Sequence, residues 1–431
     1  MRTEKMLFLR LALAAFGMAL ALNAYSQEPK KDVGYYLQQA AKSYREKNFS
    51  AYLENAKTVL KVRPAQPRYL YNAACAYALT GDHREAIALL GKIANMGLTY
   101  APESDEDLAS LRGTKEFQAV VDRFASNLKP VSHSSPAFTI DQKGLITESV
   151  AYDDKTKTYY VSSVHKRKVI SVDSRGNVKD FSKPGDGLWS AMGLKSDSRR
   201  RHLWVATAAH AQMMDLEKGD DGRSGIFKYD LDTGKLLKRY LLPNLPQKHW
   251  LGDIVITRAG DVFATDSLNP QIYRISKKTD TLELFADVPP MISPQGLALT
   301  PDETSLFIAD YSLGIFKLDL ITKKLTELTA PGIATIGIDG MYFYKGDLIA
   351  IQNGTRPHRV VRFKLNKNLD AIGSFETLEA NNPLFDEPTL GVIVKDTLFY
   401  IANSQWGAID KNGALSQPDK LVEPLILKVK L

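Results

Sequence analysis

The segment from Ser293 to Leu328 reads as four short strands joined by tight turns, and it restricts the possible folds more than any other part of the chain. A buried apolar run at Gly296–Thr300 precedes a Pro-Asp turn, a strand at Ser305–Asp310 and an alternating strand at Gly314–Leu320. Strands of about five residues with such short connections leave no room for crossover helices, so the predicted sheet is antiparallel. One such sheet is marginally stable alone and needs neighbours.

The chain supplies those neighbours by repeating the unit. Gly225–Leu231 (GIFKYDL) repeats Gly314–Leu320 (GIFKLDL), and the first hairpin of the unit recurs five more times. Four-stranded units at intervals of roughly 40–60 residues are typical of a β-propeller. Six copies fit between about residue 136 and the end of the chain. The predicted fold is therefore mainly β, a six-bladed β-propeller over 137–431, with a smaller all-α region before it.

That all-α region is predicted over residues 32–128, where the apolar period changes from two to 3.6. Pro67 opens a helix that stops at Gly81, and Asp82 with Glu85 forms a capping-box start for the next. Corresponding turns recur 33–34 residues apart, so this region resembles the tetratricopeptide repeat over two copies. It is expected either to hold a protein partner or to serve as a packing module. Residues 129–136 are read as a short polar linker.

Two end segments complete each other. Ala137–Ile140 is a strand without a nearby hairpin partner, and Leu425–Leu431 matches the third strand of a blade, after which the fourth is missing. We expect these two strands to pair, which closes the ring and removes an exposed sheet edge.

Residues 1–26 have the pattern of a signal peptide: a basic start, an apolar run at Leu11–Leu22 and a small-x-small site at Ala24–Ser26. The run of about twelve residues is shorter than the ~20 needed to cross a bilayer. The sequence thus predicts a periplasmic or secreted protein that starts near Gln27 and has no membrane span after cleavage.

Composition excludes several function classes. The formal charge of +7 is mild and no dense basic cluster is present, so nucleic acid is not an expected partner. Cys75 is the single cysteine and lies among alanines, which favours a buried inert thiol. The chain has no Gly-x-Ser-x-Gly, His-Glu-x-x-His or Gly-rich phosphate motif, so serine hydrolase, zinc protease and nucleotide-binding readings have no support.

The candidate site comes from the residues that precede each innermost strand, because these positions converge on the propeller axis. Alignment of the six repeats places a ring there: Glu148, Met192, Asp253, Gln295, Asp339 and Thr389. Converging carboxylates repel one another without a cation, and oxygen ligands suit Ca²⁺, with Mg²⁺, Mn²⁺ or Zn²⁺ as alternatives. The other reading is that these are turn residues satisfied by backbone amides.

At these positions the repeats resemble the gluconolactonase and senescence-marker-protein (regucalcin) family, with paraoxonases more distant. The matching residues are Glu148, Gly252-Asp253, Pro294-Gln295-Gly296 and Asp339-Gly340. The resemblance implies a divalent metal held by Glu148, Gln295 and Asp339, with a lactone carbonyl on its open side. Two residues depart from the family pattern, because Gly252 and Gln295 each stand where it has asparagine.

The ends of the second strands are expected to border the same mouth. Candidates there are Ser163, His165, Thr207, His210, Asp266, Asp310, Asn353, His358, Asn403 and Gln405-Trp406, with His249 before the third inner strand. A histidine among them titrates near neutral pH and is a candidate base. The predicted catalytic residues are Asp253, Asp339 and His210. The predicted metal ligands are Glu148, Asp253, Gln295 and Asp339.

Two functions remain open at this stage. One is an exported metal-dependent hydrolase of lactones or related esters, in which the metal polarises the carbonyl and a carboxylate or histidine activates water. The other is a non-catalytic exported protein whose propeller mouth binds a lactone, ester or sugar-like ligand and whose helices bind a protein partner.

Overall fold

The computed structural model describes residues 32–243, 246–410 and 412–431. The signal peptide predicted at 1–26 lies outside the described residues. Within them, no helix is both long and apolar enough to span a membrane. The chain forms two compact units: one holds the chain up to Leu90 with 103–117, and the other holds 91–102 with 118–431.

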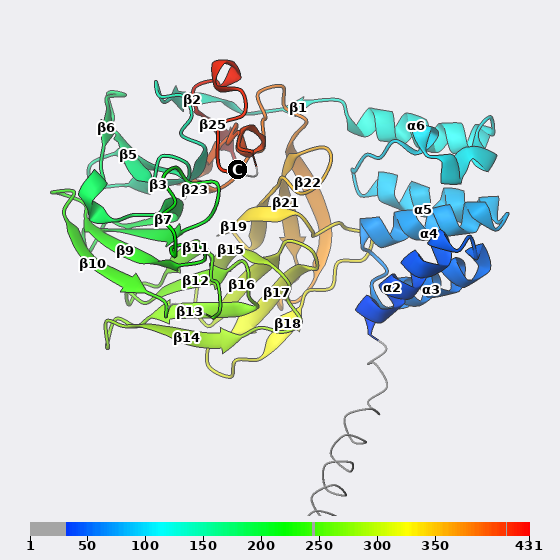
Figure 1. Ribbon diagram of the computed structural model, residues 1–431, viewed down its shortest axis with the longest axis horizontal. Helices are drawn as coiled ribbons and strands as arrows, with labels where there is room; N and C mark the ends of the chain where they lie inside the picture. Colours follow the sequence, from blue (N-terminus) through cyan, green and yellow to red (C-terminus); the bar gives the residue numbers. More distant parts are fainter. Residues whose placement is uncertain (1–31, 244–245, 411) are drawn as a thin grey trace, which may run out of the picture. The chain divides into compact units, whose positions relative to one another are not determined.

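The helices before the propeller follow the predicted caps and breaks (Figure 1). Asp32 and Asn48 cap their helices by accepting from the amides of Tyr35 and Ala51, and Asp82 accepts from the Glu85 amide at 3.2 Å. The α-helices are α2 (Val33–Arg45), α3 (Phe49–Val62), α4 (Pro67–Leu79), α5 (His83–Asn95) and α6 (Lys115–Asn127), with 3₁₀ turns η1 (Pro102–Ser104) and η2 (Glu106–Leu111). Their resemblance to the tetratricopeptide repeat stays a prediction.

The second unit confirms the six-bladed β-propeller: six antiparallel sheets lie in a ring (Figure 1). Blades 1 to 3 are β3 (Thr147–Asp153), β4 (Thr158–Ser163), β5 (Lys168–Val172) and β6 (Val178–Asp180); β7 (Ser190–Asp197), β8 (His202–Ala208), β9 (Ser224–Asp230) and β10 (Leu236–Leu241); and β11 (Leu251–Ile256), β12 (Val262–Asp266), β13 (Gln271–Ile275) and β14 (Leu282–Asp287). Blades 4 to 6 are β15 (Pro294–Leu299), β16 (Ser305–Asp310), β17 (Gly314–Asp319) and β18 (Leu325–Glu327); β19 (Ile338–Tyr344), β20 (Asp347–Gln352), β21 (Arg359–Leu365), β22 (Ile372–Ala380) and β1 (Val131–Ser132); and β23 (Gly391–Val394), β24 (Thr397–Ile401), β25 (Leu425–Lys430) and β2 (Ser135–Thr139).

The near-verbatim repeat in the sequence also repeats a turn. In blade 4 the carboxylate of Asp319 accepts from the amides of Ile321 and Thr322 and from the Thr322 hydroxyl. In blade 2 Asp230 does the same for the turn at Asp232-Thr233. In both blades the aspartate thus ends the third strand and holds the turn that leads to the fourth strand.

The hydrophobic core of the propeller is divided among the gaps between blades. Each adjacent pair of sheets encloses its own buried cluster, and together these clusters account for all six gaps of the ring. The cluster between blades 6 and 1, for example, joins Ile426 and Ile401 to Ile140 and Val161, all fully buried. Because every cluster has walls from two blades, no blade buries its faces alone.

The predicted ring closure is confirmed. β2 pairs antiparallel with β25, with Phe138 opposite Ile426 and Thr139 opposite Leu425. The segment expected as a linker is itself hydrogen-bonded to the propeller, since Val131 and Ser132 pair with Ala380 and Glu379 at the outer edge of blade 5. The chain therefore completes blade 6 with a strand from its N-terminal side, so that β25 is an inner strand of a four-stranded sheet.

Residues 91–102 belong to the same compact unit as the propeller. Arg359, 1% exposed at the start of β21, donates from Nη1 to the Met96 carbonyl and from Nε to Gln352 Oε1, both at 2.7 Å. Burial lowers the pKa of this guanidinium to about 10. A buried arginine thus ties the loop after α5 to blade 5.

The inner strands are shaped by a shared irregularity. In blades 1 to 5 the pairing of the first two strands shifts register across two residues near the start of the inner strand. Glycine at this shift permits close approach of the next blade: a Cβ on Gly193 would lie 2.4 Å from the Gly252 carbonyl oxygen, and one on Gly296 would lie 2.5 Å from that of Asp339. The inner strands therefore meet almost backbone to backbone.

The closure predicts a specific cost of breaking it. Phe138→Pro removes an amide from the β2–β25 ladder and should lower the free energy of unfolding by about 3 kcal/mol, measured by urea denaturation. Phe138→Leu keeps the amide and should lose less than half as much. Equal losses for the two variants would contradict a role for strand pairing in closure.

Candidate functional site at the propeller axis

The register shift decides which side chains share a position around the axis. In each of blades 1 to 5, two residues of the inner strand lie between the paired positions that flank the shift. The first of these two residues is Glu148, Met192, Gly252, Gln295 and Asp339 in blades 1 to 5 respectively. The expected equivalence of Asp253 with Glu148 and Asp339 is wrong by one residue, because Gly252 occupies that position in blade 3. Asp253 instead corresponds to Ser149 of blade 1, and the bulge hid this offset from a gapless alignment.

Asp253 is engaged by backbone and by a lysine. Its Oδ2 accepts from the Leu297 amide of the next blade at 3.1 Å, and its Oδ1 accepts from the Ile254 amide at 2.8 Å. Lys195 Nζ lies 3.6 Å from Oδ1. Ser149 makes the equivalent link, accepting from the Leu194 amide at 3.1 Å. Asp253 therefore fastens blade 3 to blade 4, and both of its oxygens are occupied.

Glu148 and Asp339 differ from Asp253 because neither forms an ion pair with a lysine or arginine within the described ranges. Both are nearly inaccessible, at 7% and 9% exposure. Burial, followed by repulsion from Asp339, raises the pKa of Glu148 well above its ordinary value. Burial also raises the pKa of Asp339, with Glu387 and Asp253 adding repulsion. Negative charge thus converges here without compensation.

Each of these two carboxylates is held by one oxygen. Trp406 Nε1 donates to Glu148 Oε2 at 2.8 Å. Asn353 Nδ2 donates to Asp339 Oδ2 at 2.8 Å, while the Tyr311 hydroxyl donates to Asn353 Oδ1 at 3.0 Å. The second oxygen of each carboxylate is left for another partner.

Gln295 and Gly252 lie next to each other at the axis. A Cβ on Gly252 would meet Ser267 Oγ at 2.9 Å and Gln295 Oε1 at 3.7 Å. Ser267 donates to Gln295 Oε1 at 3.2 Å, and Gln295 Nε2 donates to Ser293 Oγ at 3.0 Å. The Ser267 hydroxyl therefore occupies the space that a side chain at 252 would need, and the same hydroxyl holds Gln295 in place.

Thr389 and Met192 complete the predicted ring without a free polar group. The Thr389 hydroxyl donates to the Glu148 carbonyl at 2.8 Å, which joins blade 6 to blade 1. Met192 is 4% exposed and packs in the apolar cluster between blades 2 and 3.

Most of the polar residues expected at the mouth hold loops instead. Asp310 accepts from the amides of Ile292, Ser293, Ser312 and Leu313. Asp266 accepts from His249 Nδ1 at 2.6 Å, from the amides of Trp250 and Leu268, and from Asn269. The side chains of Ser163, Thr207 and Asn403 bond to backbone groups of neighbouring loops. These groups are saturated and have no capacity left for water activation.

The predicted base His210 lies in an aromatic cluster. Its ring stacks on Trp250 with centroids 4.0 Å apart, and Trp406 lies 6.1 Å away. Burial lowers the pKa of His210 to about 4, so the ring is neutral at physiological pH. Its Nδ1 bonds Gln212 Oε1 at 2.7 Å, while its buried Nε2 has no partner among the described residues.

Two other histidines expected at the mouth each use one ring nitrogen in a hydrogen bond. His165 donates from Nδ1 to the Gln212 carbonyl at 3.0 Å. His358 bonds Arg356 at 2.9 Å, and burial followed by Arg356 lowers its pKa to about 4.

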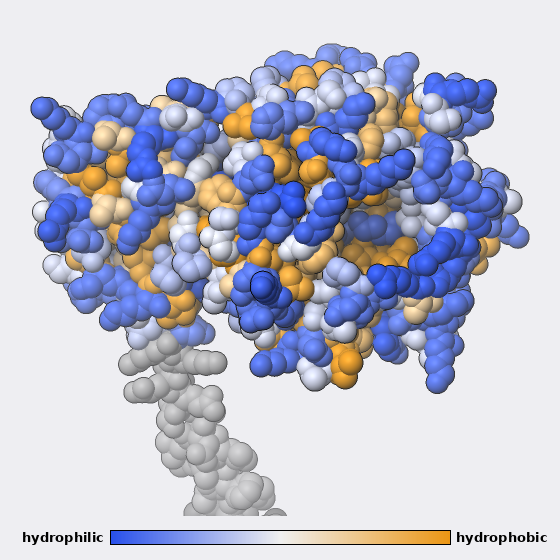
Figure 2. Space-filling view, turned by 180° about the vertical axis from the view of Figure 1, so that it is seen from behind, coloured by the Kyte–Doolittle hydropathy of each residue, from blue (hydrophilic) through white to orange (hydrophobic). Residues whose placement is uncertain are grey.

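A lysine and a tyrosine from opposite blades meet at the propeller axis. Lys195 on β7 extends to the ring of Tyr342 on β19, with Nζ 5.5 Å from the ring centroid. Blades 2 and 5 are opposite in a ring of six, so this contact crosses the axis. The Tyr342 hydroxyl also accepts from the Gly391 amide of blade 6. The surface of the propeller is hollowed on the face seen in Figure 2, and hydrophobic residues line part of that hollow.

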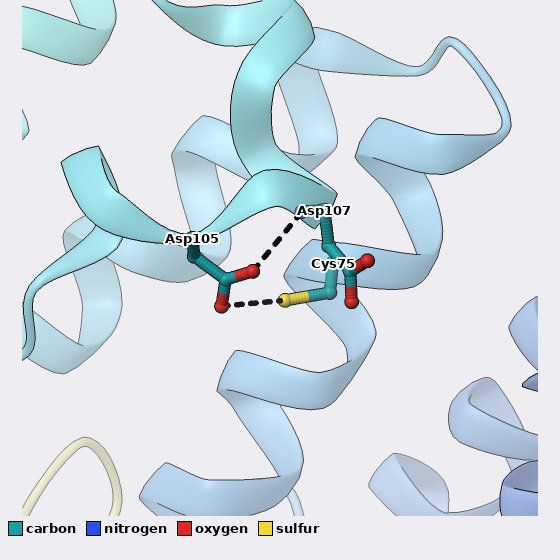
Figure 3. Close-up of side chains that lie close together, drawn as sticks. All are labelled: Cys75, Asp105 and Asp107. Atoms are coloured by element: carbon teal, nitrogen blue, oxygen red, sulfur yellow. Dashed lines mark hydrogen bonds between the residues drawn. The ribbon is translucent and has the colours of Figure 1, made fainter.

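A separate cluster lies in the helical region (Figure 3). It consists of Cys75, Asp105 and Asp107. Among the His, Cys, Asp and Glu side chains of the described ranges, these form the group of three whose possible metal-ligand atoms all lie within 4.8 Å of one another. Burial, then Asp105, raises the pKa of the Cys75 thiol, which therefore stays protonated. Tyr71 and Tyr44 donate to Asp105 and Asp107 at 2.8 and 3.0 Å. This is a satisfied hydrogen-bond network around an inert thiol.

The axial residues fit a hard divalent cation by their donor chemistry. Glu148 and Asp339 each keep one oxygen without a bonded partner among the described residues, and Gln295 contributes an amide oxygen. A cation there would remove the repulsion between the two buried carboxylates.

Sequence reasoning missed four residues of this region. Glu387, whose pKa burial raises, contributes to the charge around Asp339. Lys195, Tyr342 and Trp250 were also overlooked. The signal for Lys195 was a lysine within an otherwise buried inner strand.

Comparison with known proteins gives structural neighbours only, since no family model and no curated protein matches the chain. The chain is similar to a gluconolactonase from Xanthomonas campestris, with 17% identity, 70% of this chain and 100% of that chain covered, and a TM-score of 0.47. It is similar to the calcium-binding protein regucalcin from Agrobacterium tumefaciens, with 14% identity, coverage of 69% and 93%, and a TM-score of 0.49. A virginiamycin B lyase from Staphylococcus aureus has 16% identity, coverage of 68% and 83%, and a TM-score of 0.46.

The buried neutral His210 predicts an acid sensitivity. Its folded pKa of about 4 lies below the ordinary 6.5, so the stability it contributes is present above pH 6.5 and is lost as the pH falls towards 4. Relative to pH 7.5, the loss at pH 5 should be about 2 kcal/mol. His210→Phe keeps the stack and should reduce the fall in unfolding free energy by that amount. An unchanged pH profile in the variant would contradict the burial of a neutral ring.

The two aspartates at the axis should respond oppositely to neutralisation. Asp253→Asn weakens the links to Lys195 and Leu297 and should lower the free energy of unfolding by about 2–3 kcal/mol. In the presence of a chelator, Asp339→Asn should leave stability unchanged or raise it, because a buried charge is removed. Urea denaturation of both variants measures the difference. The assignment fails if Asp253→Asn is as stable as the native protein.

Proposed function

We propose that this protein is an exported, divalent-metal-dependent hydrolase of lactones or related esters, with its site at the propeller axis. The observation that carries the proposal is the pair of buried, uncompensated carboxylates of Glu148 and Asp339. The motif resemblance at Glu148, Gln295 and Asp339 supports the same reading. The signal-peptide pattern of residues 1–26 supports export.

The metal would be held by Glu148, Gln295 and Asp339, with Ca²⁺ preferred for an all-oxygen donor set. When bound, such a cation polarises a carbonyl and stabilises the oxyanion that forms during ester hydrolysis. Gly252 contributes no side chain to the metal, and the Ser267 hydroxyl, which bonds Gln295, lies against that position.

The single open oxygen of Asp339 would hold the metal, so Asp339 would not also be the base that receives a proton from the attacking water; the bound cation would instead acidify that water. The Asn353 amide, itself bonded to Tyr311, fixes one oxygen of Asp339 and leaves the other available. Asp253 does not serve as that base either, since backbone amides and Lys195 occupy its oxygens. His210 is a weak base in its apolar surroundings and acts as part of the site wall.

Metal binding is tested by thermal or chemical unfolding with and without Ca²⁺. At about 100 times its dissociation constant, a metal ion that binds only the folded state adds about 2.7 kcal/mol to stability. Asp339→Asn should abolish this gain, and Met192→Leu, at the same register position but without a ligand oxygen, should keep it. A native protein whose stability does not change with Ca²⁺, Mg²⁺, Mn²⁺ or Zn²⁺ would refute the site.

Turnover is tested on a panel of five- and six-membered lactones with the metal-loaded protein. Asp339→Asn should remove this turnover, because it removes a ligand of the metal that polarises the carbonyl. If the native protein binds metal but hydrolyses none of the panel, the hydrolase proposal fails and the non-catalytic binding protein replaces it.

A further inference from the structure

One side of the axial site is built from aromatic rings. Trp250, His210 and Trp406 form a compact cluster in which the two tryptophan rings lie 6.4 Å apart and His210 stacks on Trp250. Both tryptophans are only partly buried and pack on the apolar cluster between blades 2 and 3. Each therefore keeps part of its surface free.

These rings are joined directly to the proposed site. Trp406 donates to Glu148, and the Trp250 amide donates to Asp266 at 3.1 Å, one residue before the inner strand of blade 3. Gln405, before Trp406, makes two side-chain bonds to the backbone of Val422 at 3.0 and 3.1 Å. Rigid loops thus hold both tryptophans beside the carboxylate.

Hydrogen-bonding groups are distributed unevenly around the axis. Blades 2 and 3 present Met192 and Gly252, which have no polar side-chain atom. Blades 4 and 5 present Gln295 and Asp339, with Asn353 and Tyr311 beside them. The site therefore has an apolar wall and a polar wall.

A single polar atom on the apolar wall lacks a partner. His210 is 5% exposed, and its Nε2 makes no hydrogen bond among the described residues. A buried polar atom of this kind requires water or a ligand to satisfy it. Because the ring stacks on Trp250, such a ligand would contact the tryptophan surface as well.

From this arrangement we infer that the substrate carries an apolar ring or chain, which lies against Trp250, His210 and Trp406 while its carbonyl faces Glu148 and Asp339. The inference rests on the proposed function and specifies its substrate class: alkyl- or aryl-substituted lactones or esters. A polyhydroxylated ring fits less well, because His210 Nε2 offers a partner to one hydroxyl only, and the other hydroxyl groups turned to the aromatic wall would lose water without gaining partners.

The test uses ligands that cannot be hydrolysed. Two cyclohexanones, one with a phenyl substituent and one with hydroxyl substituents, are titrated into the full protein with and without Ca²⁺, and tryptophan fluorescence and calorimetry report the dissociation constants. The phenyl ketone should bind at least tenfold more tightly. Trp250→Ala should weaken that binding at least tenfold and leave the hydroxylated ketone within twofold. Trp406→Ala, which also removes the hydrogen bond to Glu148, should weaken the binding of both ketones.

Two further variants keep the test decisive. Trp189→Phe changes a buried tryptophan bonded to Asp220 in another cluster and should alter neither constant. If a tryptophan-to-alanine variant fails to fold, Trp250→Phe should retain at least half of the ketone discrimination. Equal affinities for the two ketones, or tryptophan variants that bind like the native protein, would overturn the inference. Because neither ketone is hydrolysed, failure here is separate from a failure of lactone turnover.

Discussion

The close approach of the inner strands around the axis is the constraint on which the rest of the propeller depends. Gly193 and Gly296 lie so near the backbone of the next blade that no Cβ fits, and side chains such as Ser149 and Asp253 bond directly to amides of the neighbouring blade. The same crowding buries Glu148 and Asp339 and raises the pKa of both carboxylates. Carboxylates at the axis are therefore expensive to ionise, which makes them suited to binding a cation.

The carboxylates in this crowded region differ in how many of their oxygens have partners, and this difference defines the candidate site. Asp253 is neutralised by Lys195 and backbone amides and supports the fold, whereas Glu148 and Asp339 are oriented by single hydrogen bonds and keep an open oxygen. Around them, Asp266 and Asp310 use their oxygens to hold loops. The number of occupied oxygens thus distinguishes the acidic residues that support the fold from those that have an oxygen left for a ligand.

The sequence predicted the architecture because repetition, turn chemistry and apolar alternation are local signals that agree with one another. The pairing of Ala137–Ile140 with the last strand was predictable because each segment lacked a partner. The site was only partly predictable. A bulge moved Asp253 by one residue, and no local signal distinguishes a bulge from a regular strand. The contact of Trp406 with Glu148 joins residues 258 positions apart, and the occupancy of Asp310 depends on a folded loop.

The Lys195–Tyr342 contact has a consequence for how opposite blades of the ring are connected. Lys195 of blade 2 and Tyr342 of blade 5 meet across the axis, so two opposite blades touch through their side chains. Neighbouring blades are joined by strands and buried clusters, whereas these two blades have no neighbouring strand in common. A substitution at either side chain would therefore act on both halves of the ring.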